Sequence, residues 1–250
     1  MLKIKIRIAA GQIQCIDGDR EGNLTRIKNT LQKLKNVDIA CFPECSLLGW
    51  VNPEAHLLAD GIPGIDSDMI CKFAKTYGTM IAIGLAEKEG EKLYDSVILT
   101  DNEGNILLKH RKINLLSRLM SPPYTPGDTV SVIDTKYGRI GLLICADTFR
   151  KDLLQQMKEK KPDILIIPYG WAEKKEKWPR HGKRLERLVK TVAKNLNVYV
   201  VGTDLVGEIT HGPWTGYVYG GQSVIVNSIG KLLAVGKDRE PDIIIQEILL

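Results

Sequence analysis

Three reactive side chains each follow an apolar segment that is typical of a buried strand. Glu44 ends the segment "DIACFPE", Lys112 ends "NILLKHRK" and Cys145 ends "GLLIC". In α/β proteins, functional groups gather just beyond the carboxyl ends of strands. Each residue also has an ordinary explanation, since a glutamate can cap the next segment, a lysine can be solvated and a cysteine can be a small core residue. Three such explanations at once are harder to accept than any one of them.

Together, these three residue types can perform acyl transfer without a histidine. A thiol becomes a good nucleophile when it loses its proton, and a nearby carboxylate can accept that proton. A tetrahedral intermediate needs cationic or N–H donors aimed at its oxyanion, which a lysine and the backbone N–H after the nucleophile can supply. Glu44, Lys112 and Cys145 are therefore the candidate catalytic residues.

Other catalytic classes lack their local motifs in this sequence. The histidines lie in polar or loop-like stretches, at His56, His110, His181 and His211. Cys145 has neither a papain-like signature nor a glycine-flanked elbow, and neither common phosphate-loop motif occurs. The five cysteines are an odd number without a C-x-x-C pair, which argues against a disulfide framework or a zinc site and for a reducing compartment. We expect no metal, no cofactor and a cytoplasmic location.

The composition is that of an ordinary globular protein. The chain has 250 residues, of which 44% are hydrophobic and 26% charged, and its net charge of +5 is too weak and dispersed to indicate a nucleic-acid partner. No apolar run reaches transmembrane length, and the first residues alternate like a strand rather than a signal peptide, so no membrane partner is expected. Much of the positive charge lies in residues 173–184, "EKKEKWPRHGKR". This basic stretch is either a solvated helix entry or a loop that attracts an anionic substrate.

The elements that must position the candidate residues alternate between strands and helices. Apolar spacing of three and four residues predicts helices over 19–36, 67–78 and about 149–160, and another that carries Leu185 to Leu196. Short apolar runs between them predict strands, and the "DNEG" turn predicts a hairpin, so the sheet is mixed rather than purely parallel. No linker interrupts this pattern. The sequence predicts one α/β domain over residues 1–250.

The chain resembles a known family in three short segments. The segments "FPE", "HRKINL" and "LLICAD" are similar, in order and spacing, to the three catalytic segments of the nitrilase superfamily of carbon–nitrogen hydrolases. Supporting matches run from Ile4 to Gly236 and include "AAGQIQ", "YTPGD", "IIPYGW" and "GGQSVIVNSIGKLLA".

The resemblance implies both a fold and roles for matched residues. It implies a four-layer α-β-β-α sandwich with mixed sheets, whose subunits form a homodimer or a higher homo-oligomer. Glu44 would be the general base, Lys112 the oxyanion stabiliser and Cys145 the nucleophile that forms a thioester. The backbone N–H of Ala146 would face the oxyanion, and Trp171 would line the substrate pocket.

The chain departs from the family pattern in two places. Many members carry a second glutamate shortly before the "PGD" turn, where this chain has Met120. Either a nearby acid takes its place, or the loop aligns differently, or the substrate is positioned in another way. The segment "CADTFRKD" keeps Asp147 but has the small Ala146 where the family often has an aromatic residue, which should change the shape of the pocket.

Two aromatic features leave alternatives open. Trp50 would either line the pocket or belong to the core. Trp214 and Tyr217 lie in the Gly-rich segment "HGPWTGYVYGG", which would either cover the site or form a subunit interface.

The leading hypothesis is hydrolysis of a small linear amide to an acid and ammonia. The same three residues would also serve an N-carbamoyl amine or amino acid hydrolase, or a nitrilase. A hypothesis of a different class is a non-catalytic regulatory protein, or a thiol-bearing redox module, that retains the fold. Iodoacetamide would separate these classes, since a catalytic Cys145 should react much faster than the other cysteines.

Overall fold

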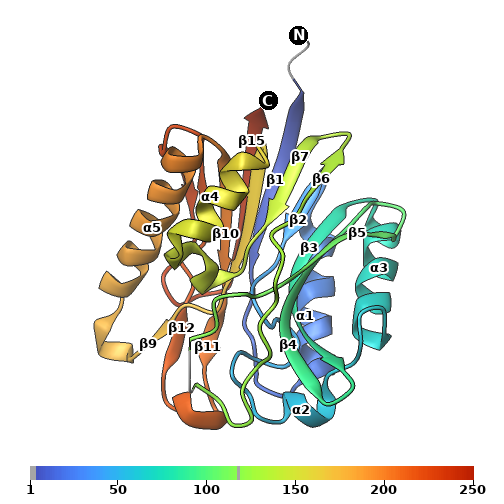
Figure 1. Cartoon of the computed structure of the whole chain (residues 1–250), viewed down its shortest axis with the longest axis vertical. Coiled ribbons are helices and arrows are strands. Elements are labelled where there is room, and N and C mark those ends of the chain that lie inside the picture. Colours follow the sequence, from blue (N-terminus) through green and yellow to red (C-terminus); the bar gives the residue numbers. More distant parts are fainter. Residues whose placement is uncertain (1–3, 117–118) are drawn as a thin grey trace.

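Two six-stranded sheets form the centre of the computed structural model, which describes residues 4–116 and 119–250 (Figure 1). The first sheet contains, in spatial order, β15 (Asp242–Leu249), β1 (Lys5–Gln12), β2 (Ile39–Cys41), β3 (Met80–Glu89), β4 (Lys92–Thr100) and β5 (Ile106–Arg111). The second contains β14 (Leu232–Val235), β13 (Val224–Val226), β10 (Tyr199–Asp204), β8 (Ile164–Tyr169), β7 (Gly138–Leu142) and β6 (Val132–Thr135). A small third sheet contains β11 (Val206–Glu208), β12 (Val218–Gly220) and β9 (Ala172–Glu173).

Helices cover the outer face of each large sheet. The helices α1 (Arg20–Lys33) and α3 (Ile65–Tyr77) lie on the first sheet, whereas α4 (Lys151–Glu159) and α5 (Arg180–Leu196) lie on the second (Figure 1). A single turn, α2 (Ala55–Leu58), follows the segment after β2. The layers are therefore α-β-β-α, which confirms the predicted fold class, and the mixed sheets are also as predicted.

The alternation of side chains along the strands builds two separate cores. In β2, Ile39 and Cys41 pack with residues of the second sheet, whereas Ala40 packs with α1 residues such as Ile27 and Leu31. Successive side chains of a strand point to opposite faces, so a sheet between a helix layer and another sheet must be apolar on both. This is why the central strands read as continuous apolar runs.

The predicted helices are all present, with shifted ends. Gly78 ends α3 in the left-handed conformation, with φ of 63°, as its position after the last apolar residue indicated. The predicted strand "GLLIC", however, ends at Leu142, and Cys145 begins a short 3₁₀ helix (Cys145–Phe149) that precedes α4. The Asp147 carboxylate takes the Ile144 N–H that a longer strand would have used.

The strand directions bring several strand ends to one region. β2 runs parallel to β1 and β3. β4 is antiparallel to both β3 and β5, so β5 runs in the same direction as β3. In the second sheet, β7 and β8 are parallel. The two sheets meet where Glu44 N–H donates to the Tyr169 carbonyl at 3.4 Å. Within residues 4–116 and 119–250, no helix is long and apolar enough to cross a bilayer.

Candidate active site

The structure brings the three candidate catalytic residues together. The Lys112 ammonium donates to Glu44 Oε1, and both side chains are almost completely buried, with Lys112 3% exposed and Glu44 0%. Cys145 is 4% exposed and lies close enough for the charges of both residues to act on its thiol. Three side chains from distant parts of the sequence therefore share one buried site, on segments that follow β2, β5 and β7.

Cys145 has an unusual backbone conformation. Its φ is 38°, in the left-handed region that residues with a Cβ seldom adopt. Thr148 fixes the turn, because its hydroxyl donates to the Cys145 carbonyl at 2.7 Å. Conformations of this kind concentrate at functional sites, where surrounding contacts hold a reactive group in place.

Asp147 connects the Cys145 turn to the Lys112 segment. One carboxylate oxygen accepts from Ile113 N–H at 3.0 Å and Asn114 N–H at 2.7 Å, just after Lys112. The other accepts from Ile144 N–H at 3.0 Å and His110 Nε2 at 2.8 Å. His110 lies in the polar end of the predicted strand, within β5, and its side chain is fully buried. Asp147 thus ties the Cys145 turn to the segment that carries Lys112.

Glu44 is fixed by both sheets. On its own sheet, the turn around it bonds to β3, because Gly84 N–H donates to the Pro43 carbonyl at 3.0 Å and the Gly84 carbonyl accepts from Ser46 N–H at 2.9 Å. From the second sheet, Gly170 N–H, just after β8, donates to Glu44 Oε2 at 2.5 Å. Glu44 Oε1 is left to face Lys112, so both oxygens have defined partners.

Asp95 is a member of the site that sequence analysis missed. It lies in β4, is 1% exposed, and accepts from Lys112 Nζ through Oδ2 at 3.1 Å. Its carbonyl accepts from the Lys112 backbone N–H at 2.8 Å. The predicted hairpin places Asp95 and Lys112 on paired strands, but it does not give the register that makes them face each other.

Burial and charge set the protonation states of these groups. Burial raises the pKa of Glu44 well above its usual range, and the Asp95 carboxylate raises it further, whereas Lys112 acts in the opposite direction. Burial alone would lower the pKa of Lys112, but the carboxylates of Glu44 and Asp95 outweigh it and hold this pKa well above its usual range. The lysine therefore stays charged.

The thiol is neutral before reaction. Burial and the Glu44 charge raise the pKa of Cys145 well above its usual range, although the Lys112 ammonium and the Gly170 N–H favour the thiolate. A neutral thiol beside a carboxylate of raised pKa can transfer its proton when it attacks.

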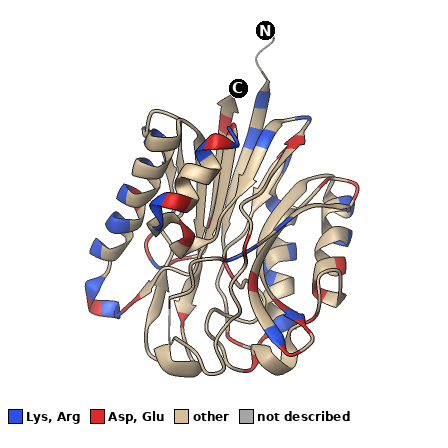
Figure 2. Ribbon diagram, viewed as in Figure 1, with Lys and Arg blue, Asp and Glu red and all other residues tan. Residues whose placement is uncertain are grey.

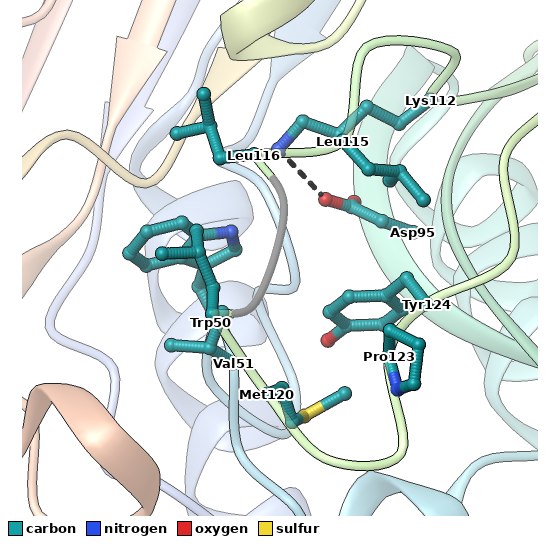
Figure 3. Close-up of a pocket in the computed structure, with 10 residues that line it drawn as sticks. Trp50, Val51, Asp95, Lys112, Leu115, Leu116, Met120, Pro123 and Tyr124 are labelled. Atoms are coloured by element: carbon teal, nitrogen blue, oxygen red, sulfur yellow. Dashed lines mark hydrogen bonds and ion pairs between the residues drawn. The ribbon is translucent and has the colours of Figure 1, made fainter.

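A pocket of about 280 Å³ opens beside Lys112 (Figure 3). Figure 3 shows the Lys112–Asp95 ion pair at one side of it and Trp50, Tyr124 and Met120 around the rest. Met120 is 5% exposed, so the position at which the family pattern suggests a glutamate carries a buried apolar side chain here. The remaining lining residues are Val51, Leu115, Leu116, Leu119 and Pro123.

The loop that contains Trp214 contacts a residue that lines this pocket. The Trp214 ring packs edge-on against Trp50, with centroids 5.3 Å apart, and Tyr217 packs against Trp214 at 4.6 Å. The sequence left two roles for this loop, a cover over the site or a subunit interface. The structure shows that the loop contacts Trp50, and both roles stay predictions. Trp50, which lines the pocket, is also 4% exposed.

Trp171 and Ala146 lie next to the site, and their predicted roles stay predictions. Trp171 follows Gly170, its N–H donates to Asp204 Oδ1 at 2.7 Å, and its ring stacks on His181 at 4.9 Å. It is not among the residues that line the pocket beside Lys112. Ala146 is buried directly after Cys145, and its carbonyl accepts from Asn114 Nδ2 at 2.6 Å.

The basic stretch 173–184 leads into α5, whose ribbon carries several Lys and Arg positions, drawn in blue in Figure 2. Lys174 and Lys175 are exposed, as a solvated helix entry requires. Lys177, Arg180, His181 and Arg184 line a separate hollow of about 240 Å³. Attraction of an anionic substrate by this stretch stays a prediction.

A family model described as carbon-nitrogen hydrolase matches residues 7–250. The chain belongs to this family. Its relatives include the omega-amidase NIT2 of Bos taurus, 28% identical over 91% of this chain and 83% of the relative. A second is an (R)-stereoselective amidase of Pseudomonas sp., 25% identical over 95% of this chain and 82% of that protein.

Solved structures agree on the fold. Nit3 of Saccharomyces cerevisiae, a member of the nitrilase superfamily, superposes with a TM-score of 0.83 at 23% identity, over 97% of this carbon–nitrogen hydrolase and 89% of Nit3. An amidase of Nesterenkonia sp. AN1 has the same TM-score at 18% identity, over 97% and 90% of the two chains. That structure carries the acetamide moiety of fluoroacetamide on the active-site cysteine of the Nesterenkonia enzyme.

Proposed function

We propose that this carbon–nitrogen hydrolase cleaves a small linear amide to an acid and ammonia through a thioester on Cys145. The observation that carries the proposal is the buried contact between Lys112 and Glu44 beside the Cys145 thiol. This contact places a base and a cation next to a nucleophile. The printed names of two relatives, an omega-amidase and a stereoselective amidase, support an amide as the substrate.

The acylation half of the reaction would use each residue once. Glu44 accepts the thiol proton while Cys145 Sγ bonds to the carbonyl carbon of the amide. The negative charge that develops on the carbonyl oxygen is stabilised by the Lys112 ammonium and the Ala146 N–H. The protonated Glu44 then gives its proton to the amide nitrogen, the C–N bond breaks and ammonia leaves.

The deacylation half repeats these roles with water. Glu44 takes a proton from a water molecule, whose oxygen attacks the thioester carbon. The second tetrahedral intermediate uses the same oxyanion donors. Its collapse breaks the C–S bond, releases the acid and returns the proton to Cys145, so the enzyme ends in its starting state.

Two alternatives within the same chemistry are an N-carbamoyl hydrolase and a nitrilase. They differ in the substrate rather than in the three catalytic residues. The alternative of another class, a regulatory protein without catalysis, predicts an unreactive Cys145 although the fold is kept.

A single panel tests all of these. Ammonia release is measured from linear amides, N-carbamoyl compounds and nitriles, with the wild type and Cys145→Ala side by side. We expect turnover of amides that Cys145→Ala loses by at least about a hundredfold. Cys41 is a matched control, because it is also buried but lies in the core between the sheets, so Cys41→Ala should keep turnover.

The contrary outcomes are distinct. Turnover of carbamoyl compounds alone, or of nitriles alone, would mean that the substrate belongs to that class and is not a linear amide. No turnover together with an unreactive Cys145 would favour the regulatory protein. Full activity in Cys145→Ala would rule out a thioester on Cys145 as the intermediate.

The remaining expectations concern assembly and location. We propose a homodimer or higher homo-oligomer, a small-molecule substrate and a cytoplasmic location. Analytical ultracentrifugation tests the assembly, and a single species at the monomer mass would contradict it.

A further inference from the structure

We propose that Asp95 is a second carboxylate of the active site, a positioning residue that shares the Lys112 ammonium with Glu44 and thereby keeps Glu44 a strong proton acceptor. The proposal rests on the proposed function, since it assigns Glu44 the part of base. It adds a residue from β4 to a site otherwise built from the segments after β2, β5 and β7.

The hairpin of β4 and β5 brings Asp95 to Lys112. Ser96 pairs with Arg111 at the last rung of the ladder, so Asp95 and Lys112 face each other one step further on. The bond from Lys112 N–H to the Asp95 carbonyl, at 2.8 Å, extends the ladder to this pair. Side chains directly opposite each other in an antiparallel pair share a face. The ion pair of 3.1 Å between Lys112 Nζ and Asp95 Oδ2 is therefore built on a rigid element.

The second oxygen of Asp95 is also occupied. Cys45 Sγ donates to Asp95 Oδ1 at 3.5 Å, and the Cys45 thiol is itself 3.7 Å from the Tyr124 hydroxyl. Cys45 directly follows Glu44 and has φ of 44°, so the turn that carries the base also holds the second carboxylate. Asp95 is thus fixed between the lysine and the base segment.

Charge gives this arrangement a chemical consequence. Glu44 and Asp95 are two buried carboxylates that share the Lys112 cation. With both ionised, the cluster holds one negative charge more than Lys112 balances, and an unbalanced buried charge is unfavourable. A proton taken up by Glu44 removes the excess. Glu44 therefore accepts the Cys145 proton more readily than it would if Asp95 did not also bind Lys112.

The test compares three variants of the full chain. Asp95→Asn keeps the shape and removes the charge, whereas Asp95→Glu keeps the charge and changes the shape. Glu87→Gln is the matched control, since Glu87 is a buried carboxylate on the neighbouring strand that pairs with Lys109 and Arg111, away from the pocket. Circular dichroism checks the folding of each variant.

Two pH profiles are recorded for each variant. The first is kcat/KM for the best amide, whose acid limb reports the base of the free enzyme. The second is the rate of Cys145 alkylation by iodoacetamide, followed by mass spectrometry, which needs no turnover. We expect both curves of Asp95→Asn to move toward acid by about one pH unit, with kcat/KM at neutral pH reduced about tenfold. Asp95→Glu and Glu87→Gln should keep the wild-type positions of both curves.

The outcomes separate this proposal from the proposed function. A drop in activity of Asp95→Asn that is equal at every pH, with both curves unmoved, would overturn it and leave Asp95 a structural residue. A shift of the same size in Asp95→Glu would overturn it too, because charge would not be the cause. If the wild type hydrolyses no amide but the alkylation curve of Asp95→Asn moves as expected, the Asp95 proposal stands and the substrate proposal fails. If Asp95→Asn does not fold, the same two curves are recorded for the smaller neutral variant Asp95→Ser, for which an acid shift supports the proposal and unmoved curves overturn it.

Discussion

A buried lysine is tolerated in this protein because two carboxylates surround it. Lys112 loses almost all contact with water, and its ammonium bonds to Glu44 and Asp95 instead. Removal of one partner of a buried ion pair typically costs about 3–5 kcal/mol, because the other charge is left uncompensated. The charge of Lys112 is thus as much a condition of the fold as of the chemistry.

The raised pKa of Glu44 predicts where activity is lost at low pH. A base must be unprotonated, and a carboxyl whose pKa is raised by burial takes up its proton as pH falls through that raised value. We therefore expect the acid limb of kcat/KM to lie clearly above the ordinary glutamic acid pKa of about 4.3. A rate profile with an amide substrate measures it, and a limb at or below 4.3 would rule out Glu44 as the titrating base.

Residue types and their order predicted the three central residues but not the fourth. Glu44, Lys112 and Cys145 each end an apolar segment, which is visible in the sequence. Asp95 depends on the register of a hairpin, and a bulge at Leu99 and Thr100 shifts that register by one residue. Since a shift of one residue exchanges the faces of a strand, the side of the sheet on which Asp95 lies could not be counted from the turn.

At the scale of elements, the site depends on close contact between the Glu44 turn and β3. A Cβ added to Gly84 would lie 2.5 Å from Glu44 Cα and 2.7 Å from the Pro43 carbonyl oxygen. Both are backbone atoms, which cannot rotate away. The absence of a side chain at Gly84 therefore lets this turn hold the base.

We expect Gly84→Ala to displace the Glu44 turn. The free energy of unfolding should fall by about 1–3 kcal/mol, and kcat should fall at least about tenfold even where the protein stays folded. Gly61→Ala is the control, because its added Cβ meets nothing closer than 3.4 Å. Urea unfolding and amide kinetics measure both effects, and a Gly84→Ala enzyme with wild-type kcat would contradict this account of the turn.

Helices and strands were predictable because their apolar periods are local, whereas the turn at Cys145 was not. The apolar run through Leu143 and Ile144 reads as a continuing strand. The chain leaves the sheet because the Asp147 carboxylate bonds to Ile144 N–H and to the segment after β5. That contact spans more than thirty residues, and periodicity does not report it.

At the scale of the whole molecule, the site exists only when the two sheets are packed together. Glu44 and Lys112 follow strands of the first sheet, and Cys145 and Gly170 follow strands of the second. Periodicity predicted an α/β protein with a mixed sheet, but the division into two stacked sheets came from the resemblance to a family. Alternating apolar residues show that a strand has two buried faces without showing what covers each face.

The packed sheets predict a loss of stability without a loss of chemistry for core substitutions far from the site. Ile8 is fully buried in β1, between the sheets. We expect Ile8→Ala to lower the free energy of unfolding by about 2–5 kcal/mol and to leave kcat/KM at 25 °C within about twofold of wild type. Urea unfolding followed by circular dichroism and by activity should give coincident midpoints. Activity lost well before the circular dichroism signal would mean that one sheet opens on its own.

The bulge in the β4–β5 hairpin also affects which changes in loop length the protein can accept. The turn at 101–105 lies at the far end of the hairpin from Asp95 and Lys112, and the bulge next to it absorbs one residue of difference between the strands. Insertions and deletions in the turn can then be taken up by gain or loss of a bulge, without moving the paired carboxylate and ammonium. The length of this loop can therefore vary while Asp95 and Lys112 stay opposite each other.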